Sequence, residues 1–247
     1  MTYFDYGRAP LAIRPDLATA HRAYWEVLRR PGSWWTGAER VALAAASRSA
    51  RDCVFCRERK QALSPYGVPG VHDHDGVLEE RAVDAVHRVV TDQSRITQRW
   101  VDDNADHGLT HEAYVELVGV VVAVLSIDEF HRALGMELEA LPSPEAGDID
   151  RYRPQILSED IGFVPTVPPE GAVGAERGLW PEGRSANVIR ALTLVPQAMK
   201  DWVALADAQY LSIAGMANFF KDDARSIDRM QMELLAGRVS AANRCFY

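Results

Sequence analysis

The three cysteines of this 247-residue chain lie in two short segments. Cys53 and Cys56 form a Cys-x-x-Cys pair, and Cys245 lies in the final segment Arg-Cys-Phe-Tyr. Two thiols at positions i and i+3 can close a strained, easily reduced disulfide when they begin a helix. The type and spacing of these residues therefore point first to redox chemistry.

The residues around the pair favour the thiolate, which is the form that attacks peroxides and disulfides. Asp52 is predicted to cap the amino terminus of a helix over residues 53–63, which runs without a helix breaker until Pro65. A thiol in the first turn of that helix lies near the positive end of the helix dipole. The cations that follow in the same segment are Arg57, Arg59 and Lys60.

Two other interpretations of the pair stay open, half of a zinc site or two ordinary buried cysteines. Zinc would need two further ligands at suitable spacing, and the sequence has no second cysteine pair. The run His72-Asp73-His74-Asp75 offers metal ligands, but it lies in a polar loop over residues 64–76, where we predict a solvated turn. His87 is predicted at a helix surface without a partner, and His131 is predicted to make an ordinary hydrogen bond.

Composition and charge indicate a soluble globular chain and exclude several classes of function. Hydrophobic residues make up 47% and charged residues 25%, which allows a full buried core. The net charge of -8 and the isoelectric point near 5.4 argue against a broad nucleic-acid or anionic-membrane surface. Residues 1–10 lack the apolar core of a signal peptide, and the most apolar run, Val115–Leu125, is about half the length that spans a bilayer. We expect a cytoplasmic protein, because a Cys-x-x-Cys pair in a reducing compartment is more often catalytic than structural.

The hydrophobic pattern predicts helices and no long strand, so the expected fold class is all-α. The segment over residues 110–134 is apolar nearly all round and ends at Gly135, which predicts a central buried helix. Thr36 and Glu39 have the spacing of a capping box, and the pair Trp34-Trp35 before them is expected in the core or at an interface. The other predicted helices cover residues 16–30, 40–50, 53–63, 76–91, 94–106, 185–194, 196–210, 216–222 and 226–243.

A stretch rich in proline and glycine interrupts the helical pattern. Residues 142–184 contain seven prolines and six glycines, which predicts an extended connection on the surface. A helical stretch with small residues precedes each cysteine segment, at 42–52 and at 234–244, and this indicates an internal repeat. We therefore predict two related helical units, residues 1–141 and 185–247, joined by this connection.

Several segments resemble the carboxymuconolactone decarboxylase and alkylhydroperoxidase D superfamily. The resemblance is carried by residues 38–56 and 229–247, which contain the cysteine motifs, and it extends to residues 109–135 and 186–192. The helical unit of that family has a Glu on one helix, a Cys-x-x-Cys at the start of the next, and a His four residues after the second Cys. The resemblance implies an all-α fold with two such units, the second of them incomplete, as in the duplicated, peroxidase-related members.

The resemblance also implies roles for the residues that match the motif. In the family the second cysteine attacks a hydroperoxide, the first resolves the sulfenic acid as a disulfide, and Glu and His relay protons. Cys56 would then attack and Cys53 would resolve. The first unit departs from the pattern, since Val41 occupies the Glu position, Phe55 stands where a second His is often found, and Lys60 occupies the His position. A lysine can stabilise a thiolate but is a poor proton shuttle at neutral pH.

The second unit keeps the Glu and lacks the rest of the motif. Glu233 occupies the Glu position before Cys245, and the chain ends at Tyr247, ahead of the second cysteine and the His. Since relatives in the superfamily include selenoproteins, one expectation is that the chain stops at a selenocysteine codon. The selenol would then be the main peroxidatic group, beside Cys245 and Glu233. A frameshift, an artificial chain end or a natural truncation would explain the ending as well.

The leading function hypothesis is a thiol- or selenol-dependent reductase of organic hydroperoxides, recharged by an electron-donor thiol protein. One alternative is a lyase of the carboxymuconolactone decarboxylase type, although such acid–base chemistry does not need two thiols. Another is a non-catalytic helical scaffold, which the departures from the family pattern favour. The exposed faces of an incomplete second unit predict a homo-oligomer. The expected catalytic residues, without a cofactor or metal, are Cys53, Cys56, Lys60, Glu233 and Cys245.

Overall fold

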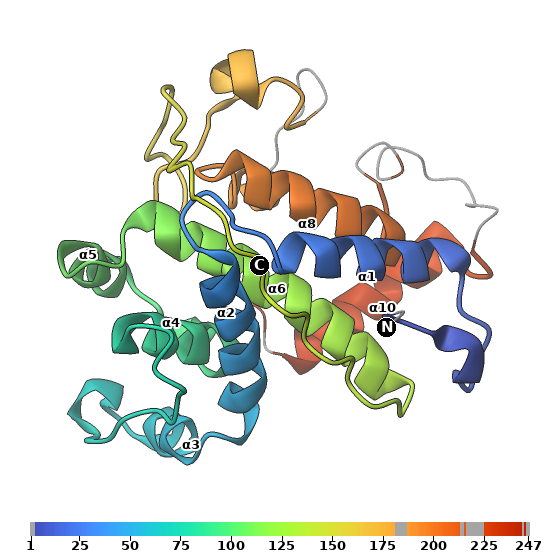
Figure 1. The fold of residues 1–247 in the computed structure, drawn as a ribbon, viewed down its shortest axis with the longest axis horizontal. Coiled ribbons are helices and arrows are strands. Elements are labelled where there is room, and N and C mark those ends of the chain that lie inside the picture. Colours follow the sequence, from blue (N-terminus) through green and yellow to red (C-terminus); the bar gives the residue numbers. More distant parts are fainter. Residues whose placement is uncertain (1–2, 181–186, 213–214, 216–224, 244, 246–247) are drawn as a thin grey trace. The chain divides into compact units, whose positions relative to one another are not determined.

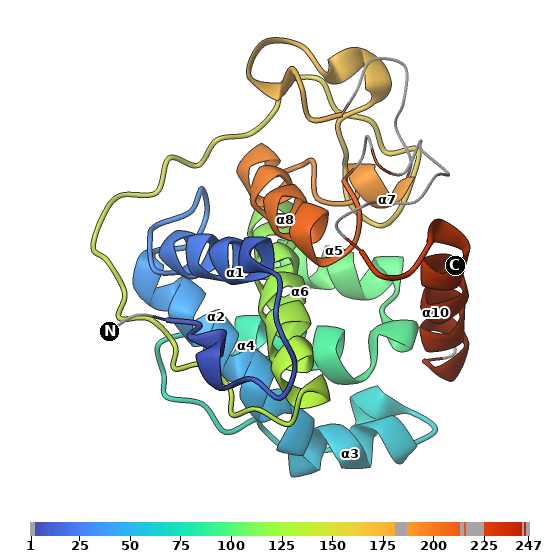
Figure 2. The ribbon, with the colours of Figure 1, turned by 90° about the vertical axis from the view of Figure 1, so that its right-hand side faces the viewer.

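The computed structural model describes a helical chain (Figures 1 and 2). Within the described residues the only β-type pairing is one isolated antiparallel bridge between Ser158 and Thr166. The all-α prediction is therefore confirmed for this part of the chain. The predicted helix over residues 216–222 lies outside it. The described residues are 3–180, 187–212, 215, 225–243 and 245.

Most of the predicted helices occur where the sequence pattern places them. The helices expected from residues 76 and 94 each begin four residues later, at residues 80 and 98. The helix expected to run to residue 194 ends at residue 190. The α-helices are α1 (Pro15–Leu28), α2 (Gly37–Ser49), α3 (Val54–Gln61), α4 (Glu80–Thr91), α5 (Gln98–Asp106), α6 (His111–Ala133), α7 (Asn187–Arg190), α8 (Pro196–Gln209) and α10 (Arg229–Ala242). Short 3-10 turns are η1 (Tyr6–Arg8), η2 (Ala50–Asp52), η3 (Pro65–Gly67), η4 (Gln93–Arg95), η5 (Pro169–Gly171) and η6 (Gly174–Glu176).

Helix α6 is the element around which residues 1–209 pack. It contacts α2, α4 and α8 and runs through the middle of these helices in both ribbon views (Figures 1 and 2). The side chains of Leu117, Val121 and Val124 are fully buried, which explains why the helix is apolar nearly all round. Thr110 caps its amino terminus through a hydrogen bond from the Ala113 N–H, and Gly135 follows its carboxyl end with a φ of 67°. The predicted central buried helix is therefore confirmed.

Helix α2 packs on α6 through small side chains and ion pairs. The predicted capping box is present, since the Thr36 N–H donates to the Glu39 carboxylate at 2.8 Å and the Glu39 N–H donates to Thr36 Oγ1 at 3.3 Å. Arg48 donates two hydrogen bonds, of 2.9 and 2.8 Å, to the buried carboxylate of Asp128 on α6. A two-pronged contact of this kind fixes the angle as well as the distance between the two helices. The pair Trp34-Trp35 is only partly buried, against the edge of the same core.

The chain divides into two compact units, residues 1–209 and residues 210–247. The first unit contains α1 to α8, and in it α8 packs against α1 and α6. The second contains α10. This boundary does not coincide with the predicted division near residue 184, and the relation of the two units as copies of one motif stays a prediction.

The predicted connection is largely without regular helix. Between residues 142 and 180 it holds only the turns η5 and η6 and the isolated bridge. It is fastened to the residues just before α8, which belong to the same unit. Arg190 forms hydrogen bonds of 3.0 and 2.6 Å to Asp160, and the Val167 N–H donates to Thr193 at 2.9 Å.

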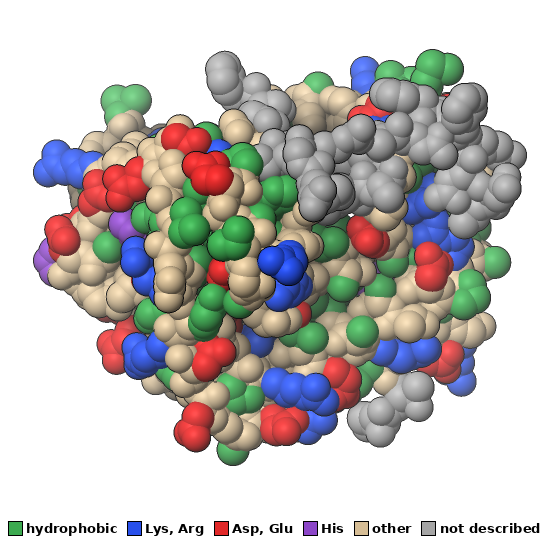
Figure 3. Space-filling view, turned by 90° about the horizontal axis from the view of Figure 1, so that it is seen from above, with side chains coloured by type: hydrophobic (Ala, Val, Ile, Leu, Met, Phe, Trp, Pro, Cys, Tyr) green, Lys and Arg blue, Asp and Glu red, His purple; other side chains and the backbone are tan. Residues whose placement is uncertain are grey.

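The outer surface mixes charge of both signs. Acidic, basic and hydrophobic side chains alternate over the face seen in Figure 3. No helix among the described residues is long and apolar enough to cross a membrane.

The packing of α6 predicts that alanine substitutions at two positions of this helix lower the free energy of unfolding by different amounts. Leu117→Ala should lower the free energy of unfolding by about 2–5 kcal/mol, because it leaves a cavity in a fully buried site. Val122→Ala, at a position 38% exposed on the same helix, should change it by less than about 0.5 kcal/mol. Urea denaturation followed by circular dichroism measures both, and equal losses would contradict the assignment of α6 as the core helix.

Candidate functional site

The cysteine pair begins helix α3. Cys53 is the N-cap residue, with its backbone extended, and its Sγ accepts a hydrogen bond of 3.4 Å from the Cys56 N–H. Asp52 instead ends the turn η2, so its prediction as the N-cap was wrong by one residue. Cys56 lies in the first helical turn as predicted and is buried, while Cys53 is half-buried. Both thiols are free.

Two imidazole rings complete a cluster with the thiols. The Nδ1 atom of His72 lies 3.5 Å from Cys53 Sγ and 3.8 Å from Cys56 Sγ. The Nδ1 atom of His87 lies 3.3 Å from Cys56 Sγ. One nitrogen or sulfur atom from each of the four residues lies within 4.8 Å of all the others. The cluster joins three elements that are separate in the sequence: the start of α3, the loop before α4, and α4 itself.

The predictions for His72 and His87 from the sequence were both wrong. His72 is 4% exposed and does not lie in a solvated turn, whereas its neighbours Asp73, His74 and Asp75 are exposed. His87 is 1% exposed and does not lie at a helix surface. A signal for His87 was available, because it follows the core residue Val83 by four positions and so shares its helix face.

Asp84 orients His72 from behind. Its Oδ1 atom lies 3.0 Å from His72 Nε2, so that Nδ1 of the same ring faces the two sulfur atoms. Asp84 also pairs with Arg59 and, at 3.7 Å, with Arg88. Burial acts to raise the pKa of Asp84, but its contacts with His72 and Arg59 lower it below the ordinary value. Burial likewise acts to lower the pKa of His72, but hydrogen bonds with Asp84 and the cysteines raise it to about 10.

The same contacts make Cys56 acidic. Burial alone would raise the pKa of its thiol, but hydrogen bonds from His72, His87 and Thr91, in that order of effect, lower it to about 5. The cluster therefore favours a thiolate at Cys56 beside a protonated imidazole at His72.

Phe55 and Gly70 hold the loop that carries His72. The Phe55 ring lies 4.9 Å from the His72 ring and is covered by the Arg59 guanidinium at 5.0 Å. A Cβ atom at Gly70, which has a φ of 152°, would lie 2.6 Å from the Phe55 ring. Only glycine lets the loop pass this closely, so Phe55 acts here as a packing residue at the position where the family often has His.

A small hollow of about 10 Å³ lies beside Cys56. This is room for about one water-sized molecule. Its lining includes Arg88, which is 4% exposed and whose guanidinium lies over the rings of Tyr66 and Trp100 at 5.1 and 5.2 Å. Two nitrogen atoms of Arg88, Nε and Nη1, are buried without a hydrogen-bond partner, although Nε lies 3.7 Å from Asp84 Oδ2 in an ion pair. Unsatisfied buried donors beside a thiolate are suited to an oxygen atom of a small ligand.

The other residues expected at the site lie elsewhere. Lys60 is exposed on α3, and no described hydrogen bond or ion pair joins it to a thiol, whereas Arg59 of the same helix reaches His72. Glu233 and Cys245 belong to the second unit. The carboxylate of Glu233 accepts hydrogen bonds of 2.6 Å from Arg229 and 2.8 Å from Tyr210, and Cys245 is exposed. Catalytic roles for Lys60, Glu233 and Cys245 stay predictions from the resemblance.

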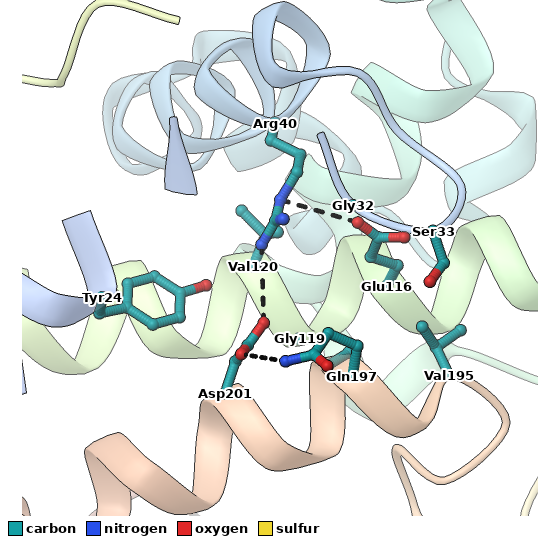
Figure 4. A pocket seen from close by; sticks show the side chains of 11 residues that line it. Tyr24, Gly32, Ser33, Arg40, Glu116, Gly119, Val120, Val195, Gln197 and Asp201 are labelled. Carbon is teal, nitrogen blue, oxygen red and sulfur yellow. Dashed lines mark hydrogen bonds and ion pairs between the residues drawn. The ribbon is translucent and has the colours of Figure 1, made fainter. Parts of the chain in front are cut away.

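A second buried polar cluster lies between α2, α6 and α8. Figure 4 shows the Arg40 side chain extending between two carboxylates, with Nε 3.6 Å from Glu116 and Nη2 4.0 Å from Asp201. The Trp34 N–H donates to the other oxygen of Glu116 at 2.7 Å. A Cβ atom at Gly32 would lie 1.7 Å from Glu116 Oε1, so a glycine is required for the carboxylate to lie there.

This second cluster surrounds a cavity of about 10 Å³, which again is room for about one water. Arg40 Nε and Glu116 Oε1 have no hydrogen-bond partner, and a water between them would serve both. Burial raises the pKa of Glu116 to about 7, against the opposing effects of Arg40 and the Trp34 N–H. Burial also raises the pKa of Asp201. The arrangement therefore fastens α8 to the core, in a space too small for an organic substrate.

Comparison with protein-family models, with curated proteins and with solved structures finds no match to this chain. The resemblance to the alkylhydroperoxidase D superfamily is confined to the segments named above, and the possible chemistry of the thiol–imidazole cluster follows from its own geometry.

The buried Glu116 predicts a pH dependence of stability. The native state holds the Glu116 proton up to a pKa of about 7, while the unfolded chain releases it near 4.5, so stability falls as pH rises between these values. The loss amounts to about 3 kcal/mol at most. Glu116→Gln, which resembles the protonated acid, should remove this part of the slope in urea denaturation measured from about pH 4 to about pH 8.

Glu129→Gln, at an exposed position on the same helix, is the matched control and should keep the wild-type slope. A Glu116→Gln variant with the wild-type slope would contradict a protonated Glu116 in the native state.

Proposed function

We propose that this protein reduces hydroperoxides with a dithiol centre in which Cys56 attacks the peroxide and Cys53 resolves the product. The observation that carries the proposal is the position of Cys56 Sγ, within 3.8 Å of two imidazole nitrogens and beside a hollow whose lining includes the buried Arg88. A second thiol lies in the same cluster. Thiolate, proton donor, anion-binding group and resolving thiol are the parts that such a reaction requires.

In the first step the Cys56 thiolate attacks the terminal oxygen of the peroxide. The O–O bond breaks, an S–O bond forms, and the departing alkoxide takes a proton from the His72 imidazolium. The products are Cys56 sulfenic acid and an alcohol. The Asp84 carboxylate, 3.0 Å from His72 Nε2, keeps the imidazole protonated and turned toward the sulfur. Arg88 places donors at the oxygen on which negative charge develops.

In the second step the Cys53 thiol attacks the sulfenic acid sulfur. A disulfide forms and the hydroxyl group leaves as water. The two cysteines are close at the start of α3, since the Cys53 Sγ accepts a hydrogen bond of 3.4 Å from the Cys56 N–H.

Exposure decides which sulfur an external reductant reaches. Cys53 is half-buried and Cys56 is buried, so a dithiol protein attacks Cys53 and forms a mixed disulfide with it. Cys56 then departs as a thiolate, and its two imidazole neighbours make it a good leaving group. The second thiol of the donor completes the exchange, which returns the dithiol and oxidises the donor to a disulfide.

The size of the hollow bears on the substrate. A space of about 10 Å³ has room for about one water-sized group, so it takes the reacting oxygen of a peroxide while the rest of the molecule stays outside. The lyase alternative needs a pocket for a whole lactone acid beside an acid–base group. The cavity next to Glu116 is no larger, so this observation favours the dithiol reaction.

The two thiols predict different phenotypes for their serine variants. Cys56→Ser should abolish peroxide consumption driven by dithiothreitol. Cys53→Ser should slow turnover by at least about 100-fold and should still consume about one equivalent of peroxide, because sulfenic acid forms but is not resolved. Cys245→Ser is the matched control: if Cys56 and Cys53 carry the reaction it should keep the wild-type rate, against the catalytic role that the resemblance implies for Cys245. The assay follows hydrogen peroxide and cumene hydroperoxide in parallel.

Peroxide consumption at the wild-type rate by the chain with both Cys53→Ser and Cys56→Ser would contradict the proposal. A wild-type chain that consumes neither peroxide, although both thiols are reduced and accessible to a thiol reagent, would favour the non-catalytic scaffold instead.

Substitution of Arg88 should weaken the reaction with peroxide and leave both thiols intact. Arg88→Lys keeps the charge but loses the planar donor pair, so kcat/KM should fall by about tenfold or more for both peroxides. Arg81→Lys, a partly exposed position on the same helix, should leave kcat/KM unchanged. If Arg88→Lys retains the wild-type kcat/KM, Arg88 does not bind the peroxide.

A further inference from the structure

The thiol–imidazole cluster has the ligand types, the number of ligands and the spacing of a metal centre. A tetrahedral zinc ion, with Zn–S bonds of about 2.3 Å and Zn–N bonds of about 2.0–2.1 Å, holds its ligand atoms about 3.3–3.8 Å apart. Three of the four sulfur–nitrogen distances in the cluster are 3.3 Å for His87 with Cys56, 3.5 Å for His72 with Cys53, and 3.8 Å for His72 with Cys56. All four ligand atoms lie within 4.8 Å of one another. We propose that the reduced protein binds one zinc ion through Cys53, Cys56, His72 and His87.

The surroundings of His72 match those of a metal-bound histidine. Metal-ligating histidines commonly donate their second ring nitrogen to a carboxylate, which fixes the ring and the lone pair on the ligating nitrogen. Asp84 Oδ1 is placed for this at 3.0 Å from His72 Nε2, and Arg59 in turn pairs with Asp84. The Nδ1 atom is thereby left to face the two sulfur atoms.

His87 offers its Nδ1 to the cluster and to no other described group. Its Nε2 atom is buried without a hydrogen-bond partner, and Cys56 Sγ is its one hydrogen-bonding neighbour in the part of the chain that the structure describes. A buried imidazole with so few partners gains a strong one when it binds a metal.

Burial and charge suit a closed structural type of site. Three of the four ligands, Cys56, His72 and His87, are buried, and Cys53 is half-buried. Two thiolates offset the two positive charges of Zn²⁺, and two neutral imidazoles complete a four-coordinate shell. The ligands also come from α3, from the loop over residues 62–79 and from α4, so a bound metal would fasten a loop that lacks α-helix to both of its flanking helices.

Metal binding and peroxide reduction use the same sulfur atoms, so they exclude each other. This consequence rests on the proposed function, whereas the metal site itself does not. Peroxide would oxidise the zinc-bound thiolates to the disulfide with two protons taken up, and it would release Zn²⁺, an alcohol and water. The zinc-bound form would then keep both thiols reduced and would react slowly with peroxide.

Binding of Co²⁺ and Zn²⁺ to the full chain, reduced and freed of metal by a chelator, tests the proposal. Co²⁺ should bind with a stoichiometry of one and give a sulfur-to-metal charge-transfer band together with the intense visible bands of a tetrahedral site. Zn²⁺ should displace it and raise the thermal unfolding midpoint. His72→Ala and His87→Ala should each weaken Co²⁺ binding by at least about 100-fold, and Asp84→Asn by about 10–100-fold.

The matched controls are His74→Ala, an exposed residue of the same loop, and Cys245→Ser, both of which should bind Co²⁺ as the wild type does. Absence of the charge-transfer band, in a chain whose Cys53 and Cys56 titrate as free thiols, would overturn the proposal. Co²⁺ binding that survives Cys53→Ser with Cys56→Ser would overturn it too.

These readouts separate the metal site from the proposed function. One-to-one binding in a protein without peroxidase activity would support the metal site and contradict the peroxidase. Peroxidase activity in a protein that binds neither ion would support the peroxidase and contradict the metal site. If both hold, one equivalent of Zn²⁺ should slow the first turnover with peroxide by at least about tenfold, and a chelator should restore it.

Discussion

The contact of the buried Cys56 sulfur with two imidazole nitrogens constrains the structure around it. A thiol with a pKa of about 5 is charged at neutral pH, and a buried charge is costly unless it is paired. His72 supplies the opposite charge, and it holds that charge because Asp84 lies behind it. The loop over residues 62–79 must therefore return to α3 with His72, and its Gly70 must pass over Phe55. Helix α4 must in turn direct His87 toward the sulfur. The surrounding helices supply the rigid frame, since α6 holds α2 and α4 in place.

Much of the fold followed from local patterns. The 23-residue helix α6 was predictable because its apolar side chains continue through several turns, and the capping box at Thr36 and Glu39 placed the start of α2. The site was predictable only in part. Cys53 and Cys56 carry a local signal, and His87 shares a face with Val83, but His72 comes from a polar loop whose sequence resembles a solvated turn. Its position depends on Asp84, Phe55 and Gly70, which meet it only after the chain has folded.

The same dependence shows how thiols and imidazoles meet here although residues 38–60 depart from the motif of the superfamily that they resemble. Lys60 occupies the family's His position and is exposed, yet two imidazoles reach Cys56 from the loop and from α4. The charge pairing needed by a thiolate is thus supplied by residues distant in the sequence. Asp84, His72 and Cys56 bring a carboxylate, an imidazole and a thiol into one chain of contacts, in a different order along the sequence from the motif that these segments resemble.

The most direct measurement is the mass of the peptide spanning Cys53 and Cys56 after one equivalent of hydrogen peroxide is added to the reduced, metal-free Cys245→Ser chain. A redox centre at this pair should give a peptide lighter by two hydrogen atoms, which resists alkylation until it is reduced. Recovery of both thiols, fully alkylated and at the original mass, would show that the pair does not react with peroxide and would contradict a redox centre at this site.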